Sequence, residues 1–138
     1  SQPLGEVLLT PTRIYVKPIL KLLTAMPQAI KAMVHVTGGG FYDNIPRVLK
    51  PGLSAKVDMT AWTPPLIFPY LQQLGGLSNE AMAHTFNCGI GYILVISPEE
   101  ASAVLSFLKD FSSQFTAHSI GELTQASAPD ASEVHLSW

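Results

Sequence analysis

The stretch from Ile30 to Leu49 reads IKAMVHVTGGGFYDNIPRVL, and its pattern constrains the fold more than any other part of the chain. Up to Val36, apolar side chains occupy every second position, which predicts a β-strand with one buried face. Three consecutive glycines follow Thr37 and permit backbone conformations that other residues avoid. Apolar residues at positions 45, 48 and 49 then indicate a short helix. The stretch therefore predicts a strand, a glycine loop and a helix in succession.

Pro46 constrains where this helix begins, because proline is well tolerated only in the first helical turn. This constraint favours Asp43 or Asn44 as the capping residue. If the helix instead begins nearer Phe41, Pro46 has to kink it. Both alternatives stay open at the level of sequence.

On the N-terminal side, residues 4–10 are interpreted as an extended segment. Pro18 suits the first turn of a helix that ends at Met26-Pro27. The apolar face of this helix comprises Ile19, Leu20, Leu22 and Leu23.

Between positions 54 and 86, the sequence predicts one strand and two helices. Alternation from Ser54 to Met59 indicates the strand. A helix with apolar residues at positions 67, 70, 71 and 74 follows, and the glycine pair at 75–76 ends it. Ser78 then caps a short helix that carries Met82 and Phe86.

The last third of the chain predicts two strands and one helix. The nearly continuous apolar run from Ile90 to Ile96 is typical of a central strand buried on both faces. Ser97 and Glu100 have the spacing of a capping box, which predicts a helix over residues 98–110. Residues 115–120 are expected to form a strand that ends at Gly121. Residues 124–132 are rich in small side chains, so we expect a mobile loop or a frayed tail there.

This order of elements predicts an α/β (α+β) fold, with a mixed β-sheet covered by helices. A two-layer arrangement stays open, because the sequence does not specify which sheet faces are covered. The 138 residues suit one domain. We place that domain at residues 1–123 and interpret residues 124–138 as a tail with a loop and a possible last strand.

Composition argues against several classes of function. The formal net charge of -2 offers no basic surface for nucleic acid, and no apolar run reaches the roughly 18 residues of a membrane span. A single cysteine, Cys88, fits a reducing, cytoplasmic location. Charged residues make up only 13% of the chain, which is low for a small domain. Either the surface is neutral and polar, or another domain or partner covers part of it.

The glycine loop is a candidate anion site. Residues Thr37, Gly38, Gly39 and Gly40 can bring backbone N–H groups close to a phosphate, and Asn44 and Arg47 can add side-chain donors. The loop is neither a P-loop nor a dinucleotide fingerprint, because the flanking residues that those motifs require are missing. Three glycines after a strand can also be a plain loop, and Arg47 can be an ordinary surface residue.

Further candidates lie elsewhere along the chain, and each has a simpler structural alternative. The candidates are His35, Thr10, Thr12, Arg13, Asn87 and Gly89. His35 can contact a ligand or only the fold, and the segment with Arg13 can face a ligand or only make a turn. The glycines near Cys88 favour close packing, and Cys88 itself suits a buried apolar role. The four histidines have no metal-ligand spacing, so no metal site is predicted.

Several motifs in a fixed order carry the most specific signal. They are TPTRIYVK at 10–17, HVTGGGFYDNIPRVL at 35–49, Trp62, FPYLQQ at 68–73, TFNCGIG at 85–91 and IGE at 120–122. From about Leu8 to Glu122, this series resembles the C-terminal domain of the aminoimidazole ribonucleotide synthetases, which are phosphoribosylformylglycinamidine cyclo-ligases. The region after Thr124 carries none of these motifs.

The resemblance implies half of an enzyme of purine biosynthesis. Members of the family use ATP and Mg²⁺ to convert formylglycinamidine ribonucleotide to aminoimidazole ribonucleotide, with activation of the formyl-amide oxygen by phosphoryl transfer. Two α/β domains enclose the cleft, and the N-terminal domain carries much of the ATP-binding apparatus and the main dimer contacts. The implied partners are this chain's own N-terminal ATP-binding domain, the substrate and a second subunit. No cofactor is expected to bind tightly to this domain alone, and the isolated chain is expected to be inactive.

In the same resemblance, residues 37–40, Asn44 and Arg47 line the cleft and hold phosphate or substrate. His35, Thr10, Thr12 and Arg13 rank second, followed by Asn87 and Gly89. No catalytic base is identified from this half. Two alternatives remain. The first is the corresponding domain of a related ATP-using enzyme, such as formylglycinamidine synthase, selenophosphate synthetase or thiamine monophosphate kinase. The second is a non-catalytic interaction module. In some eukaryotes the cyclo-ligase activity is fused to another purine enzyme, so a multifunctional parent is compatible with the resemblance.

Overall fold

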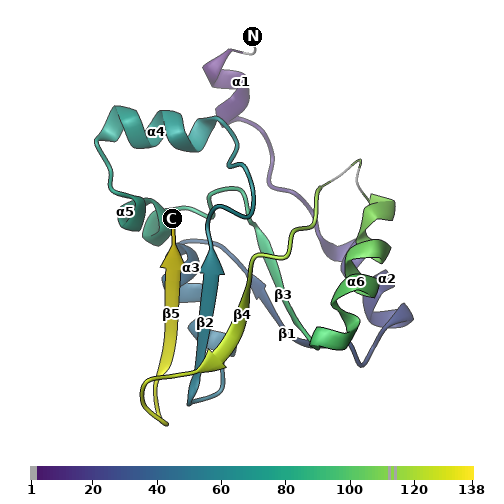
Figure 1. Ribbon diagram of the computed structural model, residues 1–138. Coiled ribbons are helices and arrows are strands. Elements are labelled where there is room, and N and C mark those ends of the chain that lie inside the picture. Colours follow the sequence, from purple (N-terminus) through teal and green to yellow (C-terminus); the bar gives the residue numbers. More distant parts are fainter. Residues whose placement is uncertain (1–2, 112, 114) are drawn as a thin grey trace.

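The strands form two separate sheets in the computed structural model, which describes residues 3–111, 113 and 115–138. β1 (Ile30–His35) pairs antiparallel with β3 (Tyr92–Ile96). In the second sheet, β2 (Leu53–Asp58) lies between β4 (Gly121–Gln125), which is antiparallel to it, and β5 (Ser132–Ser137), which is parallel. The second sheet is therefore mixed, as Figure 1 shows.

Short helices connect and cover the strands. The α-helices are α1 (Leu4–Leu8), α2 (Val16–Ala25), α3 (Gly40–Asn44), α4 (Ile67–Gly75), α5 (Asn79–Thr85) and α6 (Ala101–Leu108). The 3-10 turns are η1 (Pro46–Val48), η2 (Pro98–Glu100) and η3 (Lys109–Phe111). The expected α/β (α+β) class, with a mixed sheet and covering helices, is confirmed.

The larger hydrophobic core joins β1 and β2 to α3 and α5. Phe41, the second residue of α3, is fully buried at its centre. Its ring stacks on that of Trp62, with 6.1 Å between the ring centroids. A smaller core lies between α2 and α6, where Leu22 and Val104 pack with Leu94 of β3. Residues of the β1–β3 pair therefore contribute to both hydrophobic cores.

Several predictions based on local pattern are confirmed. The strands expected at 30–36 and 54–59 are β1 and β2. Gly76 ends α4 in the left-handed conformation, with φ +59°, which glycine adopts at little cost. The Ser78 side chain caps α5 by accepting a hydrogen bond of 3.1 Å from the N–H of Ala81.

The prediction of an extended segment at residues 4–10 is wrong, because residues 4–8 form α1. The carbonyl oxygen of Pro3 accepts hydrogen bonds from the N–H groups of Glu6 and Val7, at 3.1 and 3.2 Å. Proline is favourable at a helix start, where its missing N–H removes no bond.

The prediction of a strand at residues 115–120 is also wrong. The observed strand, β4, begins at Gly121, where the predicted strand was expected to end. Residues 115–120 are irregular, and β4 starts at Gly121. A Cβ at Gly121 would overlap the carbonyl oxygen of Lys56 in β2. This glycine therefore permits a close approach between strands and does not terminate one.

The run at 90–96 does not form a central strand. β3 begins at Tyr92, pairs with β1 alone and is half-buried throughout. Ile93 packs against the larger core, whereas Leu94 and Ile96 pack against the smaller one. The apolar run thus reflects two cores on opposite faces of a two-stranded sheet.

The capping box at Ser97 and Glu100 does not form. Residues 98–100 make the 3-10 turn η2, in which the backbone N–H of Glu100 donates to the carbonyl of Ser97 at 3.0 Å. The Ser97 side chain makes no capping hydrogen bond, and α6 begins only at Ala101. At the C-terminal end, β4 includes Thr124 and Gln125, and a turn leads into β5.

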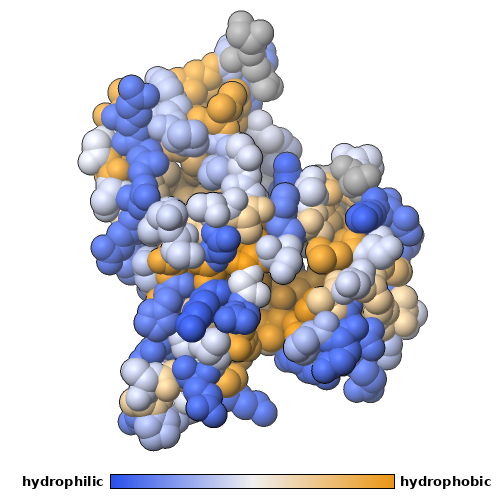
Figure 2. Space-filling view, viewed as in Figure 1, coloured by the Kyte–Doolittle hydropathy of each residue, from blue (hydrophilic) through white to orange (hydrophobic). Residues whose placement is uncertain are grey.

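The helix α4 exposes apolar side chains that were expected on its buried face. Tyr70 and Leu74 are 47% and 71% exposed, and Leu66, one turn earlier, is 85% exposed. These residues are spaced four apart, so they form one stripe. Ile67 and Leu71 face inward and are only half-buried. Figure 2 shows apolar surface in this upper part of the molecule, over α4 and α1.

Candidate functional site

The glycine loop at residues 37–40 joins β1 to α3. Gly39 and Gly40 have φ angles of +89° and +56°, a region that residues with a Cβ rarely adopt. Gly39 is the residue that precedes α3, so the expected cap at Asp43 or Asn44 is wrong. α3 ends at Asn44, and Pro46 opens the 3-10 turn η1, because a proline N cannot donate to the carbonyl four residues earlier.

The structure requires glycine at two of these three positions, for different reasons. A Cβ at Gly40 would overlap the carbonyl oxygen of Ala83 and lie 3.1 Å from that of Phe86, because α3 and α5 pack closely there. A Cβ at Gly39 would meet the side chain of Asp43. Gly38 differs from both, because no atom lies within 4 Å of its Cβ position and its φ is not in the left-handed region. Packing within the described chain therefore does not require glycine at position 38.

All four carbonyl oxygens of the loop accept hydrogen bonds. The Nδ2 group of Asn44 donates to the carbonyls of Thr37, Gly38 and Gly40, at 3.4, 3.2 and 2.7 Å. The carbonyl of Gly39 accepts from the N–H of Asp43 at 3.1 Å, and that of Thr37 also accepts from the N–H of Gly40 at 3.0 Å. The acceptors of the loop are thus turned inward.

Of the four backbone donors of the same loop, only the N–H of Gly40 has a partner among the described residues. Within residues 3–111, 113 and 115–138, no acceptor binds the N–H groups of Thr37, Gly38 or Gly39. Thr37 and Gly38 are exposed. A run of backbone N–H groups with the carbonyls turned away is the arrangement that binds anions in protein loops. The geometry therefore permits the phosphate contact that the sequence predicts for this loop.

Two charged side chains follow the loop in the chain, and one of them, Asp43, contacts it. The Asp43 side chain folds back toward Gly39, as the overlap with a Cβ there shows. Its carboxylate would repel an anion, but it can accept a hydrogen bond from a hydroxyl or amidine group of the same ligand. Arg47, in η1, is exposed, and no carboxylate of the described residues pairs with it. The guanidinium can therefore contact a ligand, and its predicted role in phosphate binding stays a prediction.

Asn44 lies elsewhere than its predicted role suggests. Its side chain is 4% exposed, and its Oδ1 accepts a hydrogen bond from the Thr37 hydroxyl at 3.4 Å. Together with the three bonds from Nδ2, this occupies the amide within the loop itself.

His35, at the end of β1, is exposed and belongs to an aromatic cluster that sequence patterns did not predict. Its ring centroid lies 6.3 Å from that of Tyr15 and 6.0 Å from that of Tyr92. The Tyr15 hydroxyl occupies the space that a Cβ at Gly91 would need. Burial raises the pKa of Tyr15, with nearby Arg13 acting in the opposite direction. The motif around Arg13 is thereby anchored beside the strand that leads into the glycine loop.

Thr10, Thr12 and Arg13 are exposed in the irregular segment between α1 and α2. The Thr10 hydroxyl donates to the carbonyl of Glu6 at 3.2 Å, which continues the turn after α1. Among the described residues, no hydrogen bond joins these three side chains to the glycine loop. Their role in lining a cleft stays a prediction.

The turn at residues 87–89 serves packing. The side chain of Asn87 accepts a hydrogen bond from the N–H of Gly89 at 2.9 Å, and the Trp62 indole donates to the carbonyl of Cys88 at 2.9 Å. Cys88 has a φ of +48°, and burial raises the pKa of its thiol, which keeps it protonated and unreactive. Phe86, just before this turn, lies beside Gly40, so the turn also adjoins the glycine loop.

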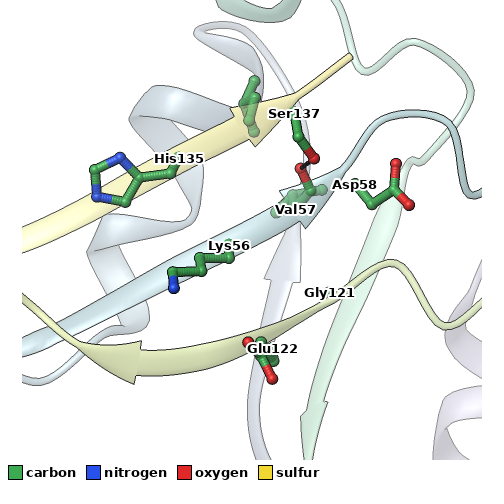
Figure 3. A pocket seen from close by; sticks show the side chains of 8 residues that line it. Lys56, Val57, Asp58, Gly121, Glu122, His135 and Ser137 are labelled. Carbon is green, nitrogen blue, oxygen red and sulfur yellow. Dashed lines mark hydrogen bonds between the residues drawn. The ribbon is translucent and has the colours of Figure 1, made fainter.

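A second polar surface was not predicted. A shallow depression of about 330 Å³ lies on the solvent face of the β4–β2–β5 sheet. Lys56, Glu122 and His135 project there from three neighbouring strands, as Figure 3 shows. These residues lie far apart in the sequence, and only strand pairing brings them together. Charges of both signs are mixed, so the depression favours no single class of ligand.

Comparisons with known proteins agree on the family. The profile of the family described as "AIR synthase related protein, C-terminal domain" matches residues 1–131. A phosphoribosylformylglycinamidine cyclo-ligase of Bordetella petrii is 48% identical over 108 residues, which cover 78% of this chain and 31% of that protein. One of Magnetococcus marinus is 43% identical over 136 residues, which cover 99% of this chain and 37% of that protein. The chain thus spans about a third of the length of these curated relatives.

A solved structure supports the fold. A chain in the crystal structure of the HypE–HypF complex matches with a TM-score of 0.63 and 21% identity, over 96% of this chain and 43% of that one. At this identity the match concerns the fold alone. The profile match over nearly the whole chain, together with relatives more than 40% identical, shows that this chain belongs to the AIR synthase related family, as a C-terminal domain of that family.

Proposed function

We propose that this chain is the C-terminal, substrate-binding half of an ATP-dependent cyclo-ligase. The full-length enzyme converts formylglycinamidine ribonucleotide to aminoimidazole ribonucleotide in purine biosynthesis. The name of the relatives supports this reaction. The observation that carries the binding role is the glycine loop. No acceptor among the described residues binds its N–H groups at positions 37–39, while all its carbonyls accept hydrogen bonds.

The chemistry of the substrate matches the charges at this loop. A ribonucleotide brings a phosphate for the free N–H groups and for Arg47. It also brings hydroxyl and amidine donors, which the carboxylate of Asp43 can accept. A site with amide donors and a carboxylate side by side suits such a ligand better than a simple anion. His35, Thr10, Thr12, Arg13, Asn87 and Gly89 are proposed to line the cleft around it.

The rest of the enzyme supplies what this chain lacks. Among the described residues, no three His, Cys, Asp or Glu side chains come together, so we assign no Mg²⁺ ligands to this half. ATP and Mg²⁺ are proposed to bind mainly on the N-terminal domain, where ATP provides the phosphoryl group that activates the formyl-amide oxygen. The residues of this half bind and orient the substrate, and the isolated chain is inactive.

The exposed apolar stripe on α4 supports a covering domain. Leu66, Tyr70 and Leu74 present an uncharged surface, and α4 contains no buried residue. The relatives are about two and a half times as long as this chain. We propose that their additional chain, the N-terminal domain, covers this stripe. The full-length protein is further proposed to be a cytoplasmic homodimer. No described helix is long and apolar enough to cross a membrane.

A chimeric enzyme tests the proposed reaction. In the Magnetococcus marinus cyclo-ligase, the matching C-terminal 37% is replaced by this chain, which is 43% identical to it. The chimera is expected to close the imidazole ring in the presence of ATP, whereas this chain alone and the truncated relative are inactive. The intact relative serves as the positive control. The product, aminoimidazole ribonucleotide, is measured by a colorimetric assay for its amino group.

The outcome also separates the alternatives. A well-folded chimera that is inactive on formylglycinamidine ribonucleotide would contradict the proposal. Activity on selenide or thiamine monophosphate instead would assign the chain to a related ATP-using enzyme. Inactivity on all three substrates would favour an interaction module.

Removing the charge at position 47 tests the phosphate contact. Arg47→Ala is expected to weaken binding of formylglycinamidine ribonucleotide to this chain about tenfold or more, because a charge-assisted hydrogen bond contributes about 1.5–3 kcal/mol. The measurement is calorimetric titration. Lys109→Ala is the matched control, since it removes an equal charge from an exposed residue on the far side of the smaller core. Equal affinities for the two variants would remove Arg47 from the site.

A further inference from the structure

Asn44 was expected to contact the ligand, but its side chain faces the wrong way for that role. It is 4% exposed, and both ends of its amide bind the loop that the ligand is proposed to meet. We infer that Asn44 is a positioning residue, which turns the carbonyls of the glycine loop inward so that its N–H groups face the ligand. This inference rests on the proposed binding role of the loop.

The argument begins with the flexibility of the loop. Gly38, Gly39 and Gly40 allow each peptide plane to rotate, so either a carbonyl or an N–H group can face outward. A carbonyl oxygen facing a phosphate repels it, whereas an N–H group attracts it. An anion site made of glycines therefore needs a device that selects one orientation.

The Asn44 amide selects this orientation by bonding the loop carbonyls. Its Nδ2 group lies within 3.4 Å of three of the four loop carbonyls, and the fourth is held by the N–H of Asp43. Rotation of the peptide plane that carries the Gly38 or Gly40 carbonyl breaks its hydrogen bond to the buried Asn44 amide, which is unfavourable. The bond from the Thr37 hydroxyl to Oδ1 orients the amide so that Nδ2 points at the loop.

The position of Asn44 in the fold makes this contact rigid. It is the last residue of α3, and it lies between Phe41 and Ile45, which are both buried in the larger core. The side chain is therefore anchored by packing on one side and bonds the loop on the other. Pre-organisation of this kind increases affinity because the loop does not have to be ordered when the ligand binds.

Asn44→Ala, in the ¹⁵N,¹³C-labelled chain, tests the inference in two independent ways. The first readout needs no ligand. Carbonyl ¹³C resonances of Gly38 and Gly40 are expected to move upfield when their hydrogen bonds to Asn44 are lost. Those of Thr37 and Gly39 are expected to move least, because they keep bonds from the N–H groups of Gly40 and Asp43. Unchanged resonances at Gly38 and Gly40 would overturn the inference.

The second readout is titration with inorganic phosphate, followed at the N–H resonances of Thr37, Gly38 and Gly39. These are expected to shift saturably in the wild-type chain, with affinity at least about tenfold weaker in Asn44→Ala. Ser78→Ala is the matched control. It removes the cap of α5 and so destabilises the fold, but it should bind phosphate like the wild type.

The outcomes separate this inference from the proposed function. If wild type and Asn44→Ala bind phosphate equally, Asn44 does not position the loop, although the loop still binds anions. If Ser78→Ala loses binding as well, the effect is one of general stability, and the inference fails. If the wild-type loop does not respond to phosphate, the inference fails together with the proposed phosphate site, and activity of the chimera then decides whether the reaction stands.

Discussion

Gly40→Ala is expected to destabilise the chain by more than about 3 kcal/mol. A left-handed φ of +56° costs a residue with a Cβ roughly 1–2 kcal/mol. The new Cβ would also overlap the carbonyl oxygen of Ala83, which belongs to the backbone of α5 and cannot rotate away. Relief requires α3 and α5 to separate, which opens the larger core. Urea denaturation followed by circular dichroism measures the loss.

Gly38→Ala is the control for this effect, because it adds the same methyl group two residues earlier in the same loop. No atom lies within 4 Å of its Cβ position, and its φ is not left-handed. Its stability is expected to stay within about 0.5 kcal/mol of the wild type. Equal losses at positions 38 and 40 would show that the packing of α3 on α5 is not what requires glycine at position 40.

Phe41→Ala is expected to cost about 3–5 kcal/mol, the usual loss when a buried phenylalanine is truncated. Phe41 is fully buried, and its ring stacks on Trp62 in the larger core. The midpoint of thermal or urea unfolding measures the change.

Leu74→Ala provides a matched comparison, since it also truncates a large apolar residue. Leu74 is 71% exposed on α4, so its loss in this chain is expected to stay below about 0.5 kcal/mol. A cost at Leu74 close to that at Phe41 would mean that α4 packs against the chain more tightly than its exposure indicates.

Phe41 also links stability to the proposed site. It follows Gly40 directly, so the core fixes the C-terminal end of the glycine loop. Asn44 then fixes the carbonyls of the same loop. Two buried residues of α3 thus hold the glycine loop, even though Thr37 and Gly38 are exposed.

Patterns that depend on neighbours in the chain were predicted well. Alternation identified β1 and β2, Gly76 marked the end of α4, and Ser78 marked the start of α5. These features follow from side-chain periodicity, from a positive φ and from one capping bond, all of which act within a few residues. The order of the motifs was enough to indicate the family, which the comparisons then showed.

Features that depend on distant backbone were missed. Gly121 resembles a terminator in sequence, but it begins β4 because the carbonyl of Lys56 approaches it closely. The contacts of Tyr15 with His35 and Gly91 likewise join segments far apart in the chain. No local period contains this information, because it arises only when strands pair and helices pack.

The glycine loop shows both levels in one motif. The sequence by itself determined that a strand ends in a flexible glycine loop with polar residues after it, because glycine and alternation are local properties. Only the tertiary structure decided that Asn44 turns inward and that no acceptor in the described part of the chain binds the N–H groups of residues 37–39. The reason is physical: a peptide plane in a glycine loop has no preferred direction until buried groups outside that loop supply hydrogen-bond partners for one of its faces.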